Sequence, residues 1–147
     1  MKAMIRDNRG FTIKELLLVF IIVFALIFFL QPLALEIGEE AHEIICANNL
    51  RESGKALYIY AKEHNGDFPP SLKVLYEEEY LADERIMDCP AAKEEIGTPD
   101  NPDYSYVSGL SVRDPSGAVL VQDKGGNHAT NGMNVLYLDG RVKWERE

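Results

Sequence analysis

An uninterrupted apolar run near the N-terminus limits the architecture of this chain more than any other feature. Residues 16–30, LLLVFIIVFALIFFL, carry no polar atom in any side chain. Together with residues 11–15 they reach membrane-spanning length, since roughly 20 helical residues cross the hydrocarbon core of a bilayer. The chain after Gln31 is rich in polar residues. The sequence therefore predicts three parts: a leader peptide over residues 1–10, the transmembrane half of a stalk helix over 11–31, and a globular domain over 32–147.

The charges around the apolar run predict its orientation. Lys2, Arg6 and Arg9 precede the run with a single acidic residue, Asp7, and no comparable basic cluster follows it. Because basic residues stay on the cytoplasmic side of a membrane, we expect a cytoplasmic N-terminus and an exported domain. The formal net charge is −9, which provides no obvious electrostatic surface for nucleic acid, so no nucleic-acid partner is expected.

Beyond the apolar run, apolar and small residues recur at the spacing of a helix. They are Ile37, Ala41, Ile45, Leu50, Gly54, Leu57 and Ala61. Asn65-Gly66 is a helix stop signal, and Pro69-Pro70 prevents continuation. We expect one helix of about fifty residues, from Phe11 to about His64, that is apolar all round in its first half and amphipathic in its second.

Pro32 lies inside this predicted helix. A proline removes one backbone hydrogen bond and is expected to kink or loosen the helix there. The alternative is that the membrane span ends at Pro32 and a second helix begins.

The C-terminal third changes to short runs that are typical of strands. Ser71 is a candidate N-cap for a short helix to about Tyr80, residues 81–103 are expected to be irregular, and the predicted strands are residues 104–110, 118–123, 133–139 and 141–145. DPSG at 114–117 and Asp139-Gly140 are turn signals. The predicted fold class is α+β, with the amphipathic half of a long N-terminal helix packed on a small C-terminal antiparallel sheet.

Two cysteines, Cys46 and Cys89, both fall in the part that we expect to be exported. An even number of cysteines in an oxidising compartment favours a disulfide. It would close a loop of about forty residues and contribute about 4 kcal/mol by the chain-entropy model. The alternative is two unpaired, partly buried thiols.

A carboxylate at the start of the apolar run, Glu15, needs an explanation. One explanation is that it stays at the level of the lipid headgroups, near the helix N-terminus where the helix dipole favours an anion. Another begins with a cut after Gly10, which would give Phe11 a free α-amine one helical turn from Glu15. In staggered neighbouring helices, the amine of one copy would then pair with Glu15 of another and set the register of a polymer.

The stretch RGFTIKELLLVF at residues 9–20 resembles the N-terminal processing motif of type IV pilins and type II secretion pseudopilins. The resemblance implies cleavage between Gly10 and Phe11 by a prepilin peptidase, N-methylation of Phe11, and registration of each incoming subunit by Glu15. It also implies that Pro32 is the helix-kinking proline of the family. Lys14 departs from the family pattern, since most relatives have an apolar residue there. A secretory signal peptide is the main competitor, but no A-x-A cleavage site follows the run.

The remainder of the chain resembles prepilin-like proteins whose C-termini carry a histidine, a spacer of nine residues and Asp-Gly. Here His128 precedes Asp139-Gly140 with ten residues between them. We expect His128 to be structural, because a single loop histidine among glycines and asparagines is rarely catalytic. Asp123, Asn127 and Asp139 are weak candidates for calcium, which prefers oxygen ligands from loops; no other cofactor is expected.

These patterns predict a structural, non-enzymatic subunit of a type IV pilus-like or type II secretion pseudopilus filament. The resemblance implies the following partners: copies of itself or related pilins, a prepilin peptidase and N-methyltransferase, an inner-membrane assembly platform, and membrane lipid. It implies a single-pass protein of the bacterial inner membrane whose domain is periplasmic or, after assembly, at the cell surface. The alternative function is a membrane-tethered ligand-binding domain that uses the helix only as an anchor.

Overall fold

Helix α1 (Ile13–Glu63) runs without interruption for 51 residues in the computed structural model, which describes residues 12–92 and 96–146, apart from the side chains of residues 31–37. Pro32 lies within the helix, so the prediction of one helix rather than two is confirmed. The helix ends where the sequence predicts. Asn65 and Gly66 have φ angles of 57° and 91°, and the Gly66 amide donates to the Ala61 carbonyl at 2.7 Å, which closes the last turn in a left-handed C-terminal cap.

The first part of α1 has an apolar surface that no described residue covers. Residues Ile13–Leu30 are long and apolar enough to cross a membrane, and none of them is buried in the described structure. By length and composition this segment is consistent with a single membrane span or with a signal sequence. The chain divides into two compact units, of which the second begins at Gly38.

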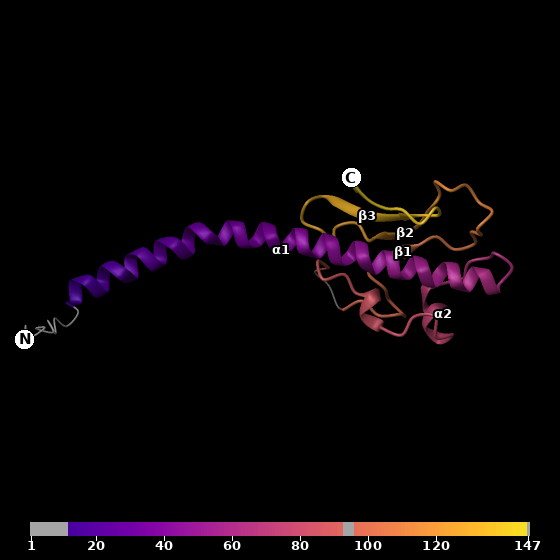
Figure 1. Ribbon diagram of the computed structural model, residues 1–147, viewed down its shortest axis with the longest axis horizontal. Helices are drawn as coiled ribbons and strands as arrows, with labels where there is room; N and C mark the ends of the chain where they lie inside the picture. The colour runs from indigo at the N-terminus through magenta and orange to yellow at the C-terminus, as the bar shows by residue number, and fades with distance from the viewer. Residues whose placement is uncertain (1–11, 93–95, 147) are drawn as a thin grey trace, which may run out of the picture. The chain divides into compact units, whose positions relative to one another are not determined.

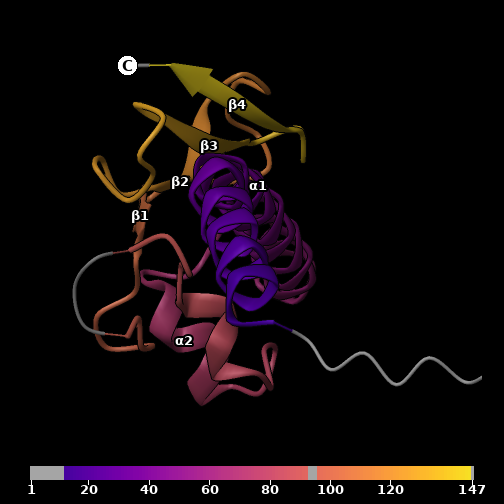
Figure 2. The ribbon, with the colours of Figure 1, turned by 90° about the vertical axis from the view of Figure 1, so that its left-hand side faces the viewer.

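The second unit is built around the remainder of α1. Figures 1 and 2 show the sheet along one side of this part of α1, with the segment that contains α2 (Leu72–Glu77) and the 3-10 helix η1 (Glu84–Met87) along the other. Both sides of the helix are consequently covered. Its buried residues follow the period of a helix and are Cys46, Ala47, Leu50, Ser53, Gly54, Ala56, Leu57, Tyr60 and Ala61.

The four strands form one antiparallel sheet in the order β1-β2-β3-β4. They are β1 (Tyr104–Tyr106), β2 (Val119–Asp123), β3 (Gly132–Tyr137) and β4 (Val142–Arg146). Each strand pairs with the next, as expected for a meander. The α+β prediction is therefore confirmed, with a long apolar helix followed by helix packed on a four-stranded antiparallel sheet. Asp139-Gly140 forms the β3–β4 turn, where Gly140 has a φ of 83° that suits glycine.

The predicted elements differ from the observed ones mainly at their ends. Strand β1 stops at Tyr106 rather than at residue 110, because residues 108–109 turn and Gly109 has a φ of 82°. Helix α2 stops at Glu77 rather than Tyr80, because Glu79 adopts a left-handed φ of 61°. Ser71 occupies the N-cap position but makes no side-chain capping hydrogen bond.

One hydrophobic core joins the helix to both layers. Its fully buried members come from α1, α2, the η1 segment and the sheet, and include Leu50, Leu57, Leu75, Met87, Leu120, Val121 and Leu136. The helix and the sheet approach closely at Gly54, where an added Cβ would lie 3.1 Å from a methyl carbon of Leu136. The second unit therefore holds its functional side chains on a packed framework.

Candidate functional site

Glu15 and Thr12 form a reciprocal cap at the first turn of α1. The backbone amide and the hydroxyl of Thr12 both donate to Oε2 of Glu15 at 2.8 Å. The Glu15 amide donates to Oγ1 of Thr12 at 3.4 Å. This is a capping box, which satisfies amides that have no partner within the helix. Among the described residues, every hydrogen bond to the Glu15 carboxylate ends on Oε2.

The predicted cleavage site and the predicted kink at Pro32 stay predictions. Gly10 and Phe11 lie outside the described residues. The backbone at Pro32 is helical, and a kink there stays a prediction.

A buried cluster of two thiols and one imidazole lies in the second unit. Cys46 comes from α1, Cys89 follows η1, and His128 comes from the loop between β2 and β3. One ligand atom from each residue lies within 4.8 Å of the others, and all three residues are buried. The Sγ atom of Cys89 is 3.8 Å from Nε2 of His128. Both cysteines are free thiols, so the structure brings together the predicted pair, and their oxidation to a disulfide stays a prediction.

Hydrogen bonds to the backbone hold Cys89 in this position. Its amide donates to Oδ2 of the buried Asp103 at 2.9 Å. The neighbouring carbonyl of Asp88 accepts from Nδ2 of Asn49 on α1 at 2.9 Å, and from the hydroxyl of Tyr104 at 3.2 Å. The segment that carries Cys89 is therefore tied to both α1 and β1.

His128 lies between two carboxylates. Its Nδ1 is 3.2 Å from Oε1 of Glu39 and its Nε2 is 3.1 Å from Oδ2 of Asp123. The side chains of His128 and Asp123 are both fully buried. Trp144 covers the imidazole in an edge-to-face contact with the ring centroids 5.1 Å apart. Glu39 also accepts from the Ala129 amide at 3.0 Å, which fixes the loop that carries the histidine.

The charges in the cluster shift the pKa values of its members. Burial opposes protonation of His128, but Asp123 and Cys89 beside Nε2 outweigh this effect and raise its pKa to about 10. A hydrogen bond with Cys46, together with the contact to His128, lowers the pKa of Cys89 to about 6 against the opposing effect of burial. The same pairing with Cys89, followed by burial, raises the pKa of Cys46. Of the two thiols, Cys89 is therefore the more acidic.

Asp123 has one satisfied oxygen and one without a partner. Its Oδ2 accepts from the backbone amide of Asn134 at 2.6 Å and from Nδ2 of Asn134 at 3.0 Å, in addition to facing His128. Its Oδ1 is buried and has no hydrogen-bond partner among the described residues. A buried carboxylate oxygen without a partner is costly unless a proton, a water molecule or a cation occupies the space beside it.

The three weak calcium candidates do not converge. Asp123 ends β2 and lies in the buried cluster, whereas Asp139 follows β3 at the opposite end of the β2–β3 ladder. Asp139 pairs with Nε of Arg141 at 2.6 Å. The Nδ2 atom of Asn127 donates to the Asp103 carbonyl at 3.1 Å. No single ion can therefore bind all three residues in this arrangement.

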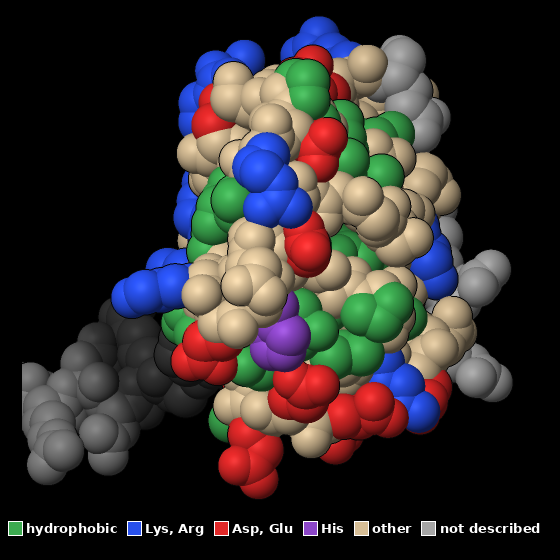
Figure 3. Space-filling model, turned by 90° about the vertical axis from the view of Figure 1, so that its right-hand side faces the viewer, with side chains coloured by type: hydrophobic (Ala, Val, Ile, Leu, Met, Phe, Trp, Pro, Cys, Tyr) green, Lys and Arg blue, Asp and Glu red, His purple; other side chains and the backbone are tan. Residues whose placement is uncertain are grey.

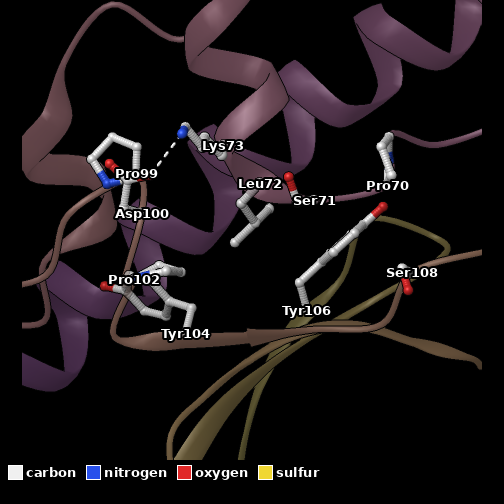
Figure 4. Close-up of a pocket in the computed structure, with 10 residues that line it drawn as sticks. All are labelled: Pro70, Ser71, Leu72, Lys73, Pro99, Asp100, Pro102, Tyr104, Tyr106 and Ser108. Atoms are coloured by element: carbon white, nitrogen blue, oxygen red, sulfur yellow. Dashed lines mark ion pairs between the residues drawn. The ribbon is translucent and has the colours of Figure 1, made fainter.

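A surface pocket lies between the α2 segment and β1 (Figure 4). Lys73 and Asp100 form an ion pair of 2.7 Å beside it. Tyr106 donates its hydroxyl proton to the carbonyl of Pro69 at 2.7 Å, so this group already has a partner. Cys89 and His128 do not line this pocket. Its chemistry is that of an exposed ion pair with tyrosine rings, which offers no nucleophile and base in contact.

The end of the unit at which α1 terminates carries side chains of both charge signs (Figure 3). Acidic and basic groups alternate there with small hydrophobic areas.

No family model, curated protein or solved structure matches this chain. The relationship to known proteins consequently rests on architecture, which is pilin-like: an apolar N-terminal helix followed by helix packed on a four-stranded antiparallel sheet.

Sequence reasoning missed the association of His128 with the two cysteines. It also missed Glu39, Asp103 and Asn134, which support the cluster. A signal was present, because two cysteines and a histidine are all common metal ligands. Their spacing follows no zinc motif, since the three residues come from separate elements.

Proposed function

We propose that this chain is a structural subunit of a type IV pilus-like or type II secretion pseudopilus filament. A prepilin peptidase removes residues 1–10 and methylates Phe11, and an inner-membrane platform assembles the mature subunit with copies of itself or related pilins. The subunit waits in the inner membrane as a single-pass protein before assembly. It is the substrate of the processing enzyme and performs no catalysis itself.

One observation carries the proposal: an exposed apolar helix begins at a carboxylate and continues into a helix packed on a small antiparallel sheet. The apolar residues Ile13–Leu30 are uncovered in the single chain, so they need lipid before assembly and neighbouring helices after it. The Thr12–Glu15 cap places the carboxylate at the N-terminal edge of this surface. The exposed apolar segment and the carboxylate at its start support both a membrane-stored and an assembled state of the subunit.

The cap also refines how Glu15 would register subunits. Because the hydrogen bonds from Thr12 end on Oε2, Oε1 is the oxygen that we assign to the Phe11 amine of an adjacent copy. In an apolar helix bundle such an ion pair is much stronger than in water, and removing one partner leaves the other charge buried. The apolar side chains pack the helices of neighbouring subunits together, and the ion pair sets the position of each subunit along the filament axis.

The experiment compares Glu15→Ala with Thr12→Ala. Glu15→Ala removes the carboxylate, whereas Thr12→Ala removes only the hydroxyl half of the cap and keeps the carboxylate. We expect Glu15→Ala to lower incorporation into sheared filaments by at least about tenfold, since loss of one partner of a buried pair costs several kcal/mol. Thr12→Ala should assemble nearly as the wild type. Immunoblots measure the ratio of protein in the filament fraction to protein in the membrane fraction for each variant.

Two results would contradict the proposal. Equal losses in both variants would mean that Glu15 acts only as a helix cap. A native protein whose N-terminus by mass spectrometry is still residue 1, in cells where it performs its role, would exclude processing altogether. Full function of a peptidase-resistant Gly10→Ala variant would favour a membrane-tethered ligand-binding domain instead.

A further inference from the structure

We propose that Cys46, Cys89 and His128 bind one Zn²⁺ ion, which locks the packing of α1 against the two loops that follow η1 and β2. This inference concerns the interior of the globular unit and goes beyond the filament role. It does not depend on processing or assembly.

The ligand types and their separations fit zinc. Typical Zn–S and Zn–N bonds of about 2.3 and 2.0–2.1 Å place sulfur and nitrogen ligands of a tetrahedral ion about 3.6 Å apart. The Sγ atom of Cys89 and Nε2 of His128 are 3.8 Å apart, and all three ligand atoms lie within 4.8 Å of one another. Thiolate and imidazole ligands together select zinc over hard cations such as calcium.

The surroundings of His128 match those of a metal-binding histidine. Its Nδ1 faces Glu39 at 3.2 Å, which leaves Nε2 toward Cys89. A metal ligand commonly donates its second ring N–H to a carboxylate, because this contact fixes the tautomer and the ring orientation. A disulfide between Cys46 and Cys89 would require no histidine and no such carboxylate.

Asp123 provides a second, independent observation. Its Oδ1 is buried without a partner, and its Oδ2 is already 3.1 Å from Nε2 of His128. A cation held by Nε2 would lie next to this carboxylate and compensate its charge. We assign Asp123 to the zinc site as a neighbouring carboxylate rather than as a ligand, because it does not belong to the group of ligand atoms that lie within 4.8 Å of one another.

The burial of the cluster argues for a structural ion rather than a catalytic pair. Cys89 and His128 are 1 % and 3 % exposed, so a substrate cannot reach the sulfur, whereas an ion can enter during local opening. Zn²⁺ binds cysteine as the thiolate and histidine through an unprotonated nitrogen, so binding releases any protons on these atoms to solvent. Three separate segments are then joined at one point.

The test titrates Co²⁺ and then Zn²⁺ into the reduced, metal-free full-length protein in detergent. We expect one Co²⁺ per chain, with the thiolate-to-cobalt charge-transfer absorption and visible bands of a tetrahedral site, and displacement by Zn²⁺. Cys89→Ser and His128→Asn should weaken binding at least about 100-fold, and Asp123→Ala roughly 10- to 100-fold. His64→Asn is the matched control, because His64 lies outside the cluster and stacks on Tyr60 with the ring centroids 3.7 Å apart. This variant should bind the metal as the wild type does.

A measurement on the wild type alone keeps the test decisive if a variant fails to fold. In mild urea, where the buried thiols open transiently, bound Zn²⁺ should protect both thiols from maleimide, and a chelator should restore their reaction. Absence of the cobalt spectrum in the folded, reduced wild type would overturn the proposal. So would unchanged binding by folded Cys89→Ser and His128→Asn, or native protein that contains no metal and a Cys46–Cys89 disulfide. Unchanged binding by Asp123→Ala would remove Asp123 from the site.

Discussion

At the residue scale, the buried cluster depends on a close approach at Gly97 that only a glycine permits. Gly97 lies against the segment that carries Cys89. A Cβ added there would meet the Met87 carbonyl oxygen at 2.2 Å and Oδ2 of Asp103 at 2.7 Å. Asp103 is the residue that binds the Cys89 amide. The glycine consequently lets the loop after η1 close over the core.

We expect Gly97→Ala to destabilise the protein by about 2–3 kcal/mol, because the backbone at Met87 would have to move and overpacking has costs of this order. Urea unfolding of the full chain in detergent measures the change. Gly117→Ala is the control, since its added Cβ meets nothing within 4 Å. A Gly97→Ala variant as stable as this control would show that the loop adapts freely.

At the scale of elements, the β3–β4 turn combines a glycine conformation with an ion pair. Gly140 has a left-handed φ of 83°, and Asp139 accepts from the Arg141 amide at 3.1 Å and from its Nε at 2.6 Å. The backbone hydrogen bond from Arg141 is the main cause that lowers the pKa of Asp139; desolvation opposes it, and the Arg141 side chain adds to the lowering. The ionised carboxylate is therefore part of the turn.

The lowered pKa of Asp139 predicts that its contribution to folding stability depends on pH. Because the folded-state pKa lies below the unfolded value, the stabilisation is present above the unfolded pKa, near 3.9, and is lost as the pH falls through the folded-state pKa. We expect the difference in urea midpoint between wild type and Asp139→Asn to be constant near neutral pH and to vanish in acid. The exposed Glu78→Gln serves as control. A difference that does not shrink in acid would contradict a role for the charge.

At the scale of the whole molecule, the hydrophobic core belongs entirely to the unit that begins at Gly38. Every described core residue lies between Cys46 and Leu138, and the apolar residues Ile13–Leu30 contribute nothing to it. The second unit therefore buries its apolar surface against its own chain, whereas the apolar surface of Ile13–Leu30 is exposed in the described structure. The proposed filament function would account for this division, since lipid or neighbouring helices would then cover the exposed segment.

We expect a fragment of residues 38–147 to be soluble and to fold without the preceding helix. Near-UV circular dichroism and a single cooperative urea transition measure this. The full chain in detergent is the reference, and the fragment should match its midpoint closely. A fragment without fixed tertiary structure would show that the first part of α1 stabilises the core.

The amino-acid sequence by itself determined the features that depend on local pattern: the apolar segment, the end of α1 at Asn65-Gly66, the four strands and the Asp139-Gly140 turn. Helical and strand periodicity and turn chemistry act over a few residues, so they can be recognised without a fold. The exact end of α2 was missed because Glu79 adopts a left-handed φ, which no local rule predicts for a glutamate.

Only the tertiary structure decided which polar residues meet. Cys46, Cys89 and His128 are separated by 43 and 39 positions, and no spacing rule brings them together. Their contact arises because α1 packs between the sheet and the η1 segment. This packing brings the loop after η1 and the loop between β2 and β3 to the same part of the helix. The same packing leaves Oδ1 of Asp123 buried without a partner, and burial is a property that a residue acquires only from the whole fold.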